Sequence, residues 1–144
     1  MIVNHQNIKK IFSEKKLNFH DYYFEDLIFE HDDTCFYKKR ENRIIKLLLL
    51  DPDFNDVELL FHGVIGCEFS SCEFWGPSPH IACVSYLEDE RKIVTPKLFK
   101  RFKEIPEKDR YLSLLNASKT YIEIKIQLIS GDVVLIVCES FELS

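Results

Sequence analysis

The order of hydrophobic and polar residues along the chain predicts mainly β-structure. Over Tyr121–Ile129 every second residue is isoleucine or leucine, and charged or polar residues stand between them. This alternation is typical of an antiparallel strand with one buried face and one exposed face. Ser130-Gly131-Asp132 is a turn sequence that leads into the apolar run Val133–Cys138, so we expect a C-terminal hairpin. Its inward face should carry Ile122, Ile124 and Ile126, and its outward face Glu123, Lys125 and Gln127.

Further strands are predicted by short runs rich in aromatic and branched residues. One of these runs, His20–His31, carries rings on both faces, which predicts either a β-bulge or a change of facing side partway along. Two others lie so close together that they form either two strands or one long strand kinked at Gly63 or Gly66. The candidate strands before the hairpin are His20–His31, Cys35–Tyr37, Ile44–Leu50, Val57–His62, Ile65–Phe69 and Ile81–Leu87.

Helical spacing is confined to short segments. Asn4–Lys16 has one apolar stripe at Ile8, Ile11 and Phe12, which predicts an N-terminal helix. Lys97–Glu104 follows a proline and is predicted to be helical, and Tyr111–Leu115 is predicted to form a further helical turn. We therefore expect an α+β, mostly β fold. It should be an antiparallel sheet or sandwich of about seven strands, with an N-terminal helix and one or two short helices near 97–115.

Composition narrows the class of protein. The chain has 144 residues, of which 46% are hydrophobic, so we expect one domain over 1–144 whose core forms without metal or disulfide. The net charge of -5 opposes nucleic-acid binding, which needs a positive field. No apolar run approaches the ~20 residues of a membrane helix. We find no signal peptide and an odd number of cysteines, five, so we predict a cytoplasmic protein with reduced thiols.

Metal-binding and catalytic motifs are weak. Cys67, Cys72, His80 and Cys83 follow the spacing C-x4-C-x7-H-x2-C, which lacks the paired knuckles of a zinc site. The run from Asp51 begins like a calcium loop but has Asp56 and His62 where glycine and glutamate are required, so we interpret it as an acidic turn between strands. No nucleophile elbow or phosphate-binding glycine loop is present. We predict no metal, no cofactor and no catalytic residue.

Two segments are candidates for binding. Ser71–His80 contains the single tryptophan, Trp75, with Glu73 before it and a Gly-Pro corner after it. Trp75 is either an exposed anchor in a stiff loop or a side chain packed at the edge of the core. The pair His20-Asp21 either orients a partner or bonds locally at a strand end. The candidate binding residues are Trp75, Glu73, His80, His20 and Asp21.

Three short motifs carry a resemblance: Phe19-His20-Asp21, Phe61-x-x-Val64 with Glu68-Phe69, and Cys72-Glu73-Phe74-Trp75-Gly76. With these the chain resembles small uncharacterised bacterial proteins, some of them encoded beside polymorphic toxins and classed as immunity proteins. The resemblance implies a cytosolic protein that binds and blocks a toxin, and it supplies no catalytic residue. An acidic chain would be steered onto a basic toxin domain.

We therefore predict a non-catalytic protein-binding domain, with toxin neutralisation as its specific form. The alternative is a small-molecule-binding β domain with an aromatic pocket near Trp75. A hydrolase built on His20, Asp21 or His80 is the third hypothesis.

Overall fold

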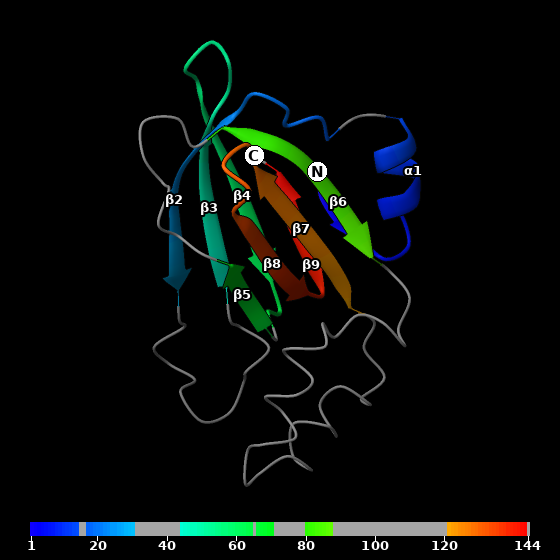
Figure 1. The fold of residues 1–144 in the computed structure, drawn as a ribbon. Coiled ribbons are helices and arrows are strands. Elements are labelled where there is room, and N and C mark those ends of the chain that lie inside the picture. Colours follow the sequence, from blue (N-terminus) through cyan, green and yellow to red (C-terminus); the bar gives the residue numbers. More distant parts are fainter. Residues whose placement is uncertain (15–16, 31–43, 65, 71–79, 88–120, 144) are drawn as a thin grey trace, which may run out of the picture.

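The computed structural model describes residues 1–14, 17–30, 44–64, 66–70, 80–87 and 121–143, which form nine strands and one helix (Figure 1). The elements are β1 (Ile2–Asn4), α1 (Ile8–Ser13), β2 (Tyr23–Glu30), β3 (Ile44–Leu50), β4 (Asp56–His62), β5 (Gly66–Ser70), β6 (Ile81–Leu87), β7 (Ile122–Leu128), β8 (Val133–Cys138) and β9 (Ser140–Leu143).

The strands form two antiparallel sheets. One has five strands in the order β1-β9-β4-β3-β2, and the other has four in the order β5-β8-β7-β6. The predicted mostly β, antiparallel fold with an N-terminal helix is therefore confirmed. The predicted C-terminal hairpin is also confirmed, since β7 and β8 pair from Ile122 with Cys138 to Gln127 with Val133. Ile122, Ile124 and Ile126 are buried, as their alternation predicts.

A single hydrophobic core joins the inner faces of both sheets. The five-stranded sheet contributes Leu47, Phe61 and Phe141 to it, and the four-stranded sheet contributes Ile124 and Ile136. The rings of Phe61 and Phe141 lie 5.5 Å apart between centroids. In β3 buried residues alternate with half-buried ones, because successive side chains of a strand point to opposite faces. One face of β3 packs in the core, and the other lies on the outer face of the sheet.

The two sheets are connected at one corner, where β4 leads into β5 and β8 leads into β9. β4 pairs with β9 in the five-stranded sheet, and β5 pairs with β8 in the four-stranded sheet. β8 and β9 are separated by Glu139 alone, whose N–H donates to the carbonyl of His62 at 3.0 Å. Gly63 sits at this bend with φ +62°, a conformation that glycine adopts without steric cost. Sharp bends of this kind let strands change sheets.

The edge strands β2 and β6 meet at a second place. The N–H of Asp21 donates to the carbonyl of Ile81 at 3.1 Å, and the N–H of Ile81 donates to the carbonyl of Tyr22 at 2.8 Å. Tyr23 and His80 form an antiparallel bridge beside them. The two sheets are thus hydrogen-bonded to each other at the end where β2 and β6 begin.

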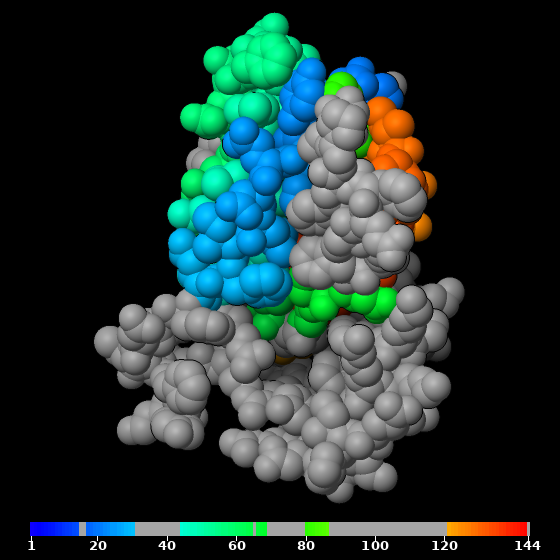
Figure 2. All heavy atoms as spheres, turned by 60° about the vertical axis from the view of Figure 1, so that its left-hand side comes forward, coloured from blue at the N-terminus to red at the C-terminus, as the bar shows by residue number. Residues whose placement is uncertain are grey.

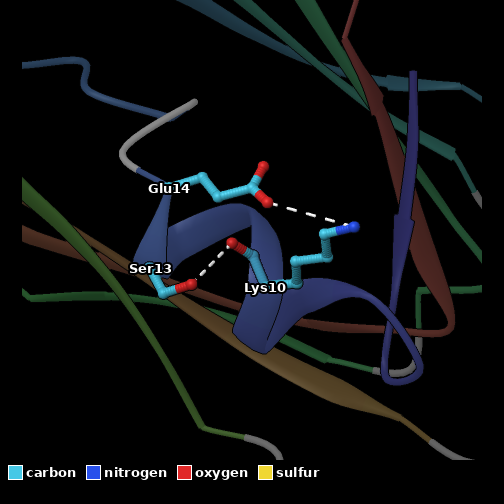
Figure 3. A network of polar contacts seen from close by, with 3 residues as sticks. All are labelled: Lys10, Ser13 and Glu14. Atoms are coloured by element: carbon cyan, nitrogen blue, oxygen red, sulfur yellow. Dashed lines mark hydrogen bonds and ion pairs between the residues drawn. The ribbon is translucent and has the colours of Figure 1, made fainter.

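The helix α1 covers part of the core with one face and exposes the other. Ile8 and Ile11 are buried, and the ring of Phe12 lies 4.5 Å from that of Tyr86 in β6. On the polar side the Ser13 hydroxyl donates to the Lys10 carbonyl at 2.8 Å, and Lys10 Nζ lies 3.9 Å from Glu14 Oε1 (Figure 3). Both contacts lie on the exposed side of α1.

Several expectations about single elements are confirmed, and others need correction. The bulge expected in the first long strand is present, as a register shift between Phe24 and Asp26. The two adjacent runs after Asp56 are two strands in different sheets rather than one kinked strand. β1 and β9 were not predicted, because three and four residues are too short to show a period. The helix is also shorter than predicted.

One prediction about the exposure of a side chain is wrong. Glu123, expected outward and exposed, does lie opposite the core face of β7 but is only 6% exposed. The segments Cys35–Tyr37, Lys97–Glu104 and Tyr111–Leu115 lie outside the described residues, and so their predictions remain predictions.

Candidate functional site

The loop between β3 and β4 is built around the carboxylate of Asp51. Its Oδ1 accepts the backbone N–H groups of Asp53 at 2.9 Å and of Asn55 at 2.8 Å, and its Oδ2 accepts the Asn55 side-chain amide at 3.0 Å. The hydrogen bonds from Asn55, side chain first and then backbone, hold the pKa of Asp51 below its ordinary value. The N–H of Phe54 donates to the Asp51 carbonyl at 2.9 Å. The loop is therefore specified by its own residues.

This loop presents Phe54 to solvent. Phe54 is 67% exposed and has φ +65°, the left-handed region that costs a residue with a Cβ about 1–2 kcal/mol. Its ring stacks on that of Tyr23 at the start of β2, with centroids 5.4 Å apart and planes inclined by 22°. The β3–β4 loop and the residues that lead into β2 lie side by side at the upper end of the molecule (Figure 2).

Two further residues extend this exposed surface. The His80 ring meets Tyr23 edge to face, with centroids 4.2 Å apart. The N–H of Ile129 donates to the His80 carbonyl at 2.9 Å, and Ile129 is 60% exposed in the β7–β8 turn. We call Tyr23, Phe54, His80 and Ile129 the aromatic patch. It gathers residues from four separate parts of the chain, at the end of the molecule where β2 and β6 begin.

The predicted pair His20-Asp21 lies beside the aromatic patch. His20 Nδ1 is 3.0 Å from Asp21 Oδ2, and both side chains are exposed. Asp21 has φ +67°, and its backbone is hydrogen-bonded to Ile81, the residue after His80. The structure therefore brings His20, Asp21 and His80 to one end of the molecule. An exposed pair of this kind is screened by water and contributes little to stability.

The described residues around the aromatic patch include several acids. The segments 20–23, 51–57, 80–81 and 129–132, which meet there, contain no lysine or arginine. Asp21, Asp53 and Asp56 expose their carboxylates. Asp132 is instead buried, and its Oδ2 accepts the Ser130 hydroxyl at 2.8 Å, which shapes the β7–β8 turn. The aromatic patch thus combines aromatic and apolar side chains with a rim of exposed carboxylates.

The other predicted groups do not join this site. Trp75 and Glu73 lie outside the described residues, as does Cys72. Burial raises the pKa of the Cys67 thiol to about 12 and also raises that of Cys138, so neither is an activated nucleophile. Within the part of the chain that the structure describes, no group of three or more His, Cys, Asp or Glu could hold a metal ion.

Sequence reasoning missed two groups. Phe54 had a visible signal, a lone ring inside the acidic turn Asp51–Asp56, but a turn sequence does not by itself indicate what the ring contacts. Glu123 had none, because its place in the alternation predicts exposure. Burial, with the nearby charge of Glu68 and against that of Lys125, raises the pKa of Glu123 to about 7.

Comparison with known proteins adds no assignment: the chain matches no protein-family model, no curated protein and no solved structure. No helix among the described residues has the length and apolar character needed to cross a membrane. The function must therefore be argued from the geometry of the site.

Proposed function

We propose that the chain is a non-catalytic protein-binding domain and that the aromatic patch is its contact surface. The observation that carries this proposal is the placement of Phe54, which is exposed, stacked on Tyr23 and held by a loop that Asp51 locks. Protein interfaces draw most of their energy from a few large side chains, surrounded by contacts that exclude water. An anchor held in place before binding loses less conformational entropy when the partner arrives.

The conformation of Phe54 supports the same proposal. A large apolar side chain at positive φ destabilises the loop twice, through backbone strain and through contact of the ring with water. Asparagine or glycine would serve a turn at this position with neither cost. Strained residues that persist on a surface cluster at ligand-binding sites. A binding role accounts for both unfavourable features at once.

The charge around the aromatic patch supports a basic partner. Carboxylates on the rim accelerate encounter with a positively charged protein, and the chain as a whole carries a net charge of -5. This agrees with the toxin-neutralising role that the resemblance implies, in which the partner is a basic toxin domain. The small-molecule alternative depends on Trp75, which lies outside the described residues.

The partner can be captured from the anchor position itself. Phe54 is replaced by photo-reactive benzoylphenylalanine, and the protein is irradiated in the cells that produce it. We expect one covalent partner, identified by mass spectrometry. The matched control is the same replacement at Phe29, which is 55% exposed at the opposite end of β2. Capture of the same proteins from both positions, or of none from Phe54, contradicts the proposal.

Toxin neutralisation is tested on the captured partner. Expressed alone, a toxin domain stops growth, and co-expression of the wild-type chain should restore it. We expect Phe54→Ala to lose most of this protection while Phe29→Ala retains it. A partner that is harmless to cells contradicts the toxin-neutralising role but leaves the binding function intact.

A further inference from the structure

We propose that the aromatic patch receives an arginine side chain of the partner, stacked on Phe54. This inference rests on the proposed binding function and names the chemistry that the surface recognises. It follows from two features that lie together: a ring with an open face, and carboxylates beside it. Either feature alone would fit many partners.

The open face belongs to Phe54. Tyr23 covers one face of this ring, since the two planes are inclined by only 22° with centroids 5.4 Å apart. Because Phe54 is nevertheless 67% exposed, its other face is turned to solvent. The face of an aromatic ring carries partial negative charge and attracts a cation placed over it. On the covered side of Phe54, the Tyr23 ring is itself in edge-to-face contact with His80.

The carboxylates belong to the same loop and the strand that follows it. Asp53 precedes Phe54 directly and is exposed. Asp56 pairs with Leu50, and Leu50 pairs with Tyr23, so Asp56 and Tyr23 share one face of the sheet two strands apart. Neighbouring strands are about 4.8 Å apart, which places the Asp56 backbone roughly 10 Å from that of Tyr23. Asp53 and Asp56 both lie within two residues of Phe54 along the chain, and we therefore expect a guanidinium stacked on Phe54 to reach one of their carboxylates.

Arginine fits this surface better than the other candidates. Its guanidinium is planar and weakly hydrated, stacks on rings, and offers paired N–H donors to a carboxylate. The lysine ammonium is compact and strongly hydrated, so it loses more on leaving water. A purely apolar anchor would bury the rim carboxylates without a partner for their charge, which is costly.

The test uses three short peptides that differ at one kind of residue: arginine, lysine or citrulline, the last being the uncharged isostere of arginine. Each is titrated into the ¹⁵N-labelled full chain, and the amide shifts are followed by NMR. We expect the arginine peptide to shift amides of the β3–β4 loop and the start of β2. The lysine peptide should bind about two- to fivefold more weakly, as for one cation–π contact at an exposed site. The citrulline peptide should give no saturable shift.

Matched variants separate this contact from general charge attraction. Phe54→Leu keeps an apolar side chain and removes the ring face, and Asp56→Asn removes one carboxylate. Both should weaken the arginine peptide, and Phe54→Leu should abolish its preference over lysine. Glu14→Gln removes the same unit of charge at the C-terminal cap of α1, a helix that lies away from the loop (Figure 1), and should leave binding unchanged.

Three outcomes would overturn the inference: no shift with the arginine peptide, equal binding of arginine and lysine peptides, or shifts centred away from the β3–β4 loop. These outcomes are distinct from failure of the proposed function. If benzoylphenylalanine at position 54 captures one partner and the arginine peptides do not bind, the binding function stands and only the arginine contact is wrong.

Discussion

The side chain of Glu139 lies directly over the Cα of Gly63, at the corner where the chain passes from one sheet to the other. A Cβ built on Gly63 would collide with the Glu139 carboxyl group and its Cγ. The Glu139 N–H also donates to the His62 carbonyl. These two contacts link the segment between β4 and β5 to the segment between β8 and β9.

Gly63→Ala should lower the free energy of unfolding by about 1–3 kcal/mol, because it adds backbone strain at φ +62° and displaces the Glu139 side chain. Urea denaturation measures the loss. Gly131→Ala is the control, since Gly131 has φ +92° but nothing within 4 Å of an added Cβ. Adding Glu139→Ala should recover part of the Gly63→Ala loss. Equal effects of the two glycine substitutions would show that the Glu139 contact is unimportant.

Phe54→Ala should weaken binding of the captured partner by about 2 kcal/mol or more, as expected for a central aromatic anchor. Its effect on stability should stay within about 1.5 kcal/mol, because Phe54 is exposed and, among the described residues, its ring contact is the stack on Tyr23. Calorimetric titration and thermal melts on the same variant measure the two quantities. Phe29→Ala is expected to leave affinity unchanged. A large drop in melting temperature with normal affinity would assign Phe54 a structural role instead.

Asp51→Ala should destabilise the β3–β4 loop and weaken partner binding, although the Asp51 carboxylate is turned into the loop. Because hydrogen bonds lower the pKa of Asp51 in the folded state, its contribution is present above the unfolded value of 3.8 and is lost as the pH falls through the folded value. The variant should therefore show a shallower loss of stability below about pH 4 than wild type. Denaturation series at several pH values test this, with Asp53→Ala as the control. Identical acid profiles for Asp51→Ala and wild type would contradict it.

Glu123→Gln should stabilise the protein at pH 8. Burial, assisted by the charge of Glu68, raises the pKa of Glu123 from its ordinary 4.5 to about 7, so the folded state binds the proton more tightly than the unfolded state. The contribution of Glu123 to the free energy of unfolding is therefore most favourable below pH 4.5, and it declines as the pH rises toward 7. The expected gain at pH 8 is about 1–2 kcal/mol after allowance for solvent screening.

The measurement for Glu123 is urea denaturation from pH 5 to pH 8, compared with Glu25→Gln on the exposed part of β2. Glu68→Gln should produce a smaller change in the same direction, because it removes the secondary cause of the shift. A Glu123→Gln variant whose stability curve runs parallel to that of wild type would show that Glu123 is ionised in the folded protein throughout.

Most of the secondary structure was predictable because it depends on neighbours in sequence. Alternating residues face opposite sides of a strand, so the pattern around Ile124 determines its inner face whatever the strand pairs with. The leucine run that ends at Asp51 predicts β3 in the same way, and rings on both faces predict the bulge after Phe24. Proline and glycine mark the turns because they restrict or free φ.

Only the tertiary structure decided the candidate site, because its parts come from distant segments. The sequence by itself determines that Asp51–Asp56 is a turn. It does not determine that Phe54 stacks on Tyr23, which depends on the pairing of β2 with β3, or that His80 joins them, which depends on where the two sheets meet. The burial of Glu123 could not be predicted from the alternation of residues either. Alternation indicates which face of the strand a residue occupies, but not what covers that face. Local steric preferences determine which segments form strands, and long-range packing determines which strand ends become neighbours.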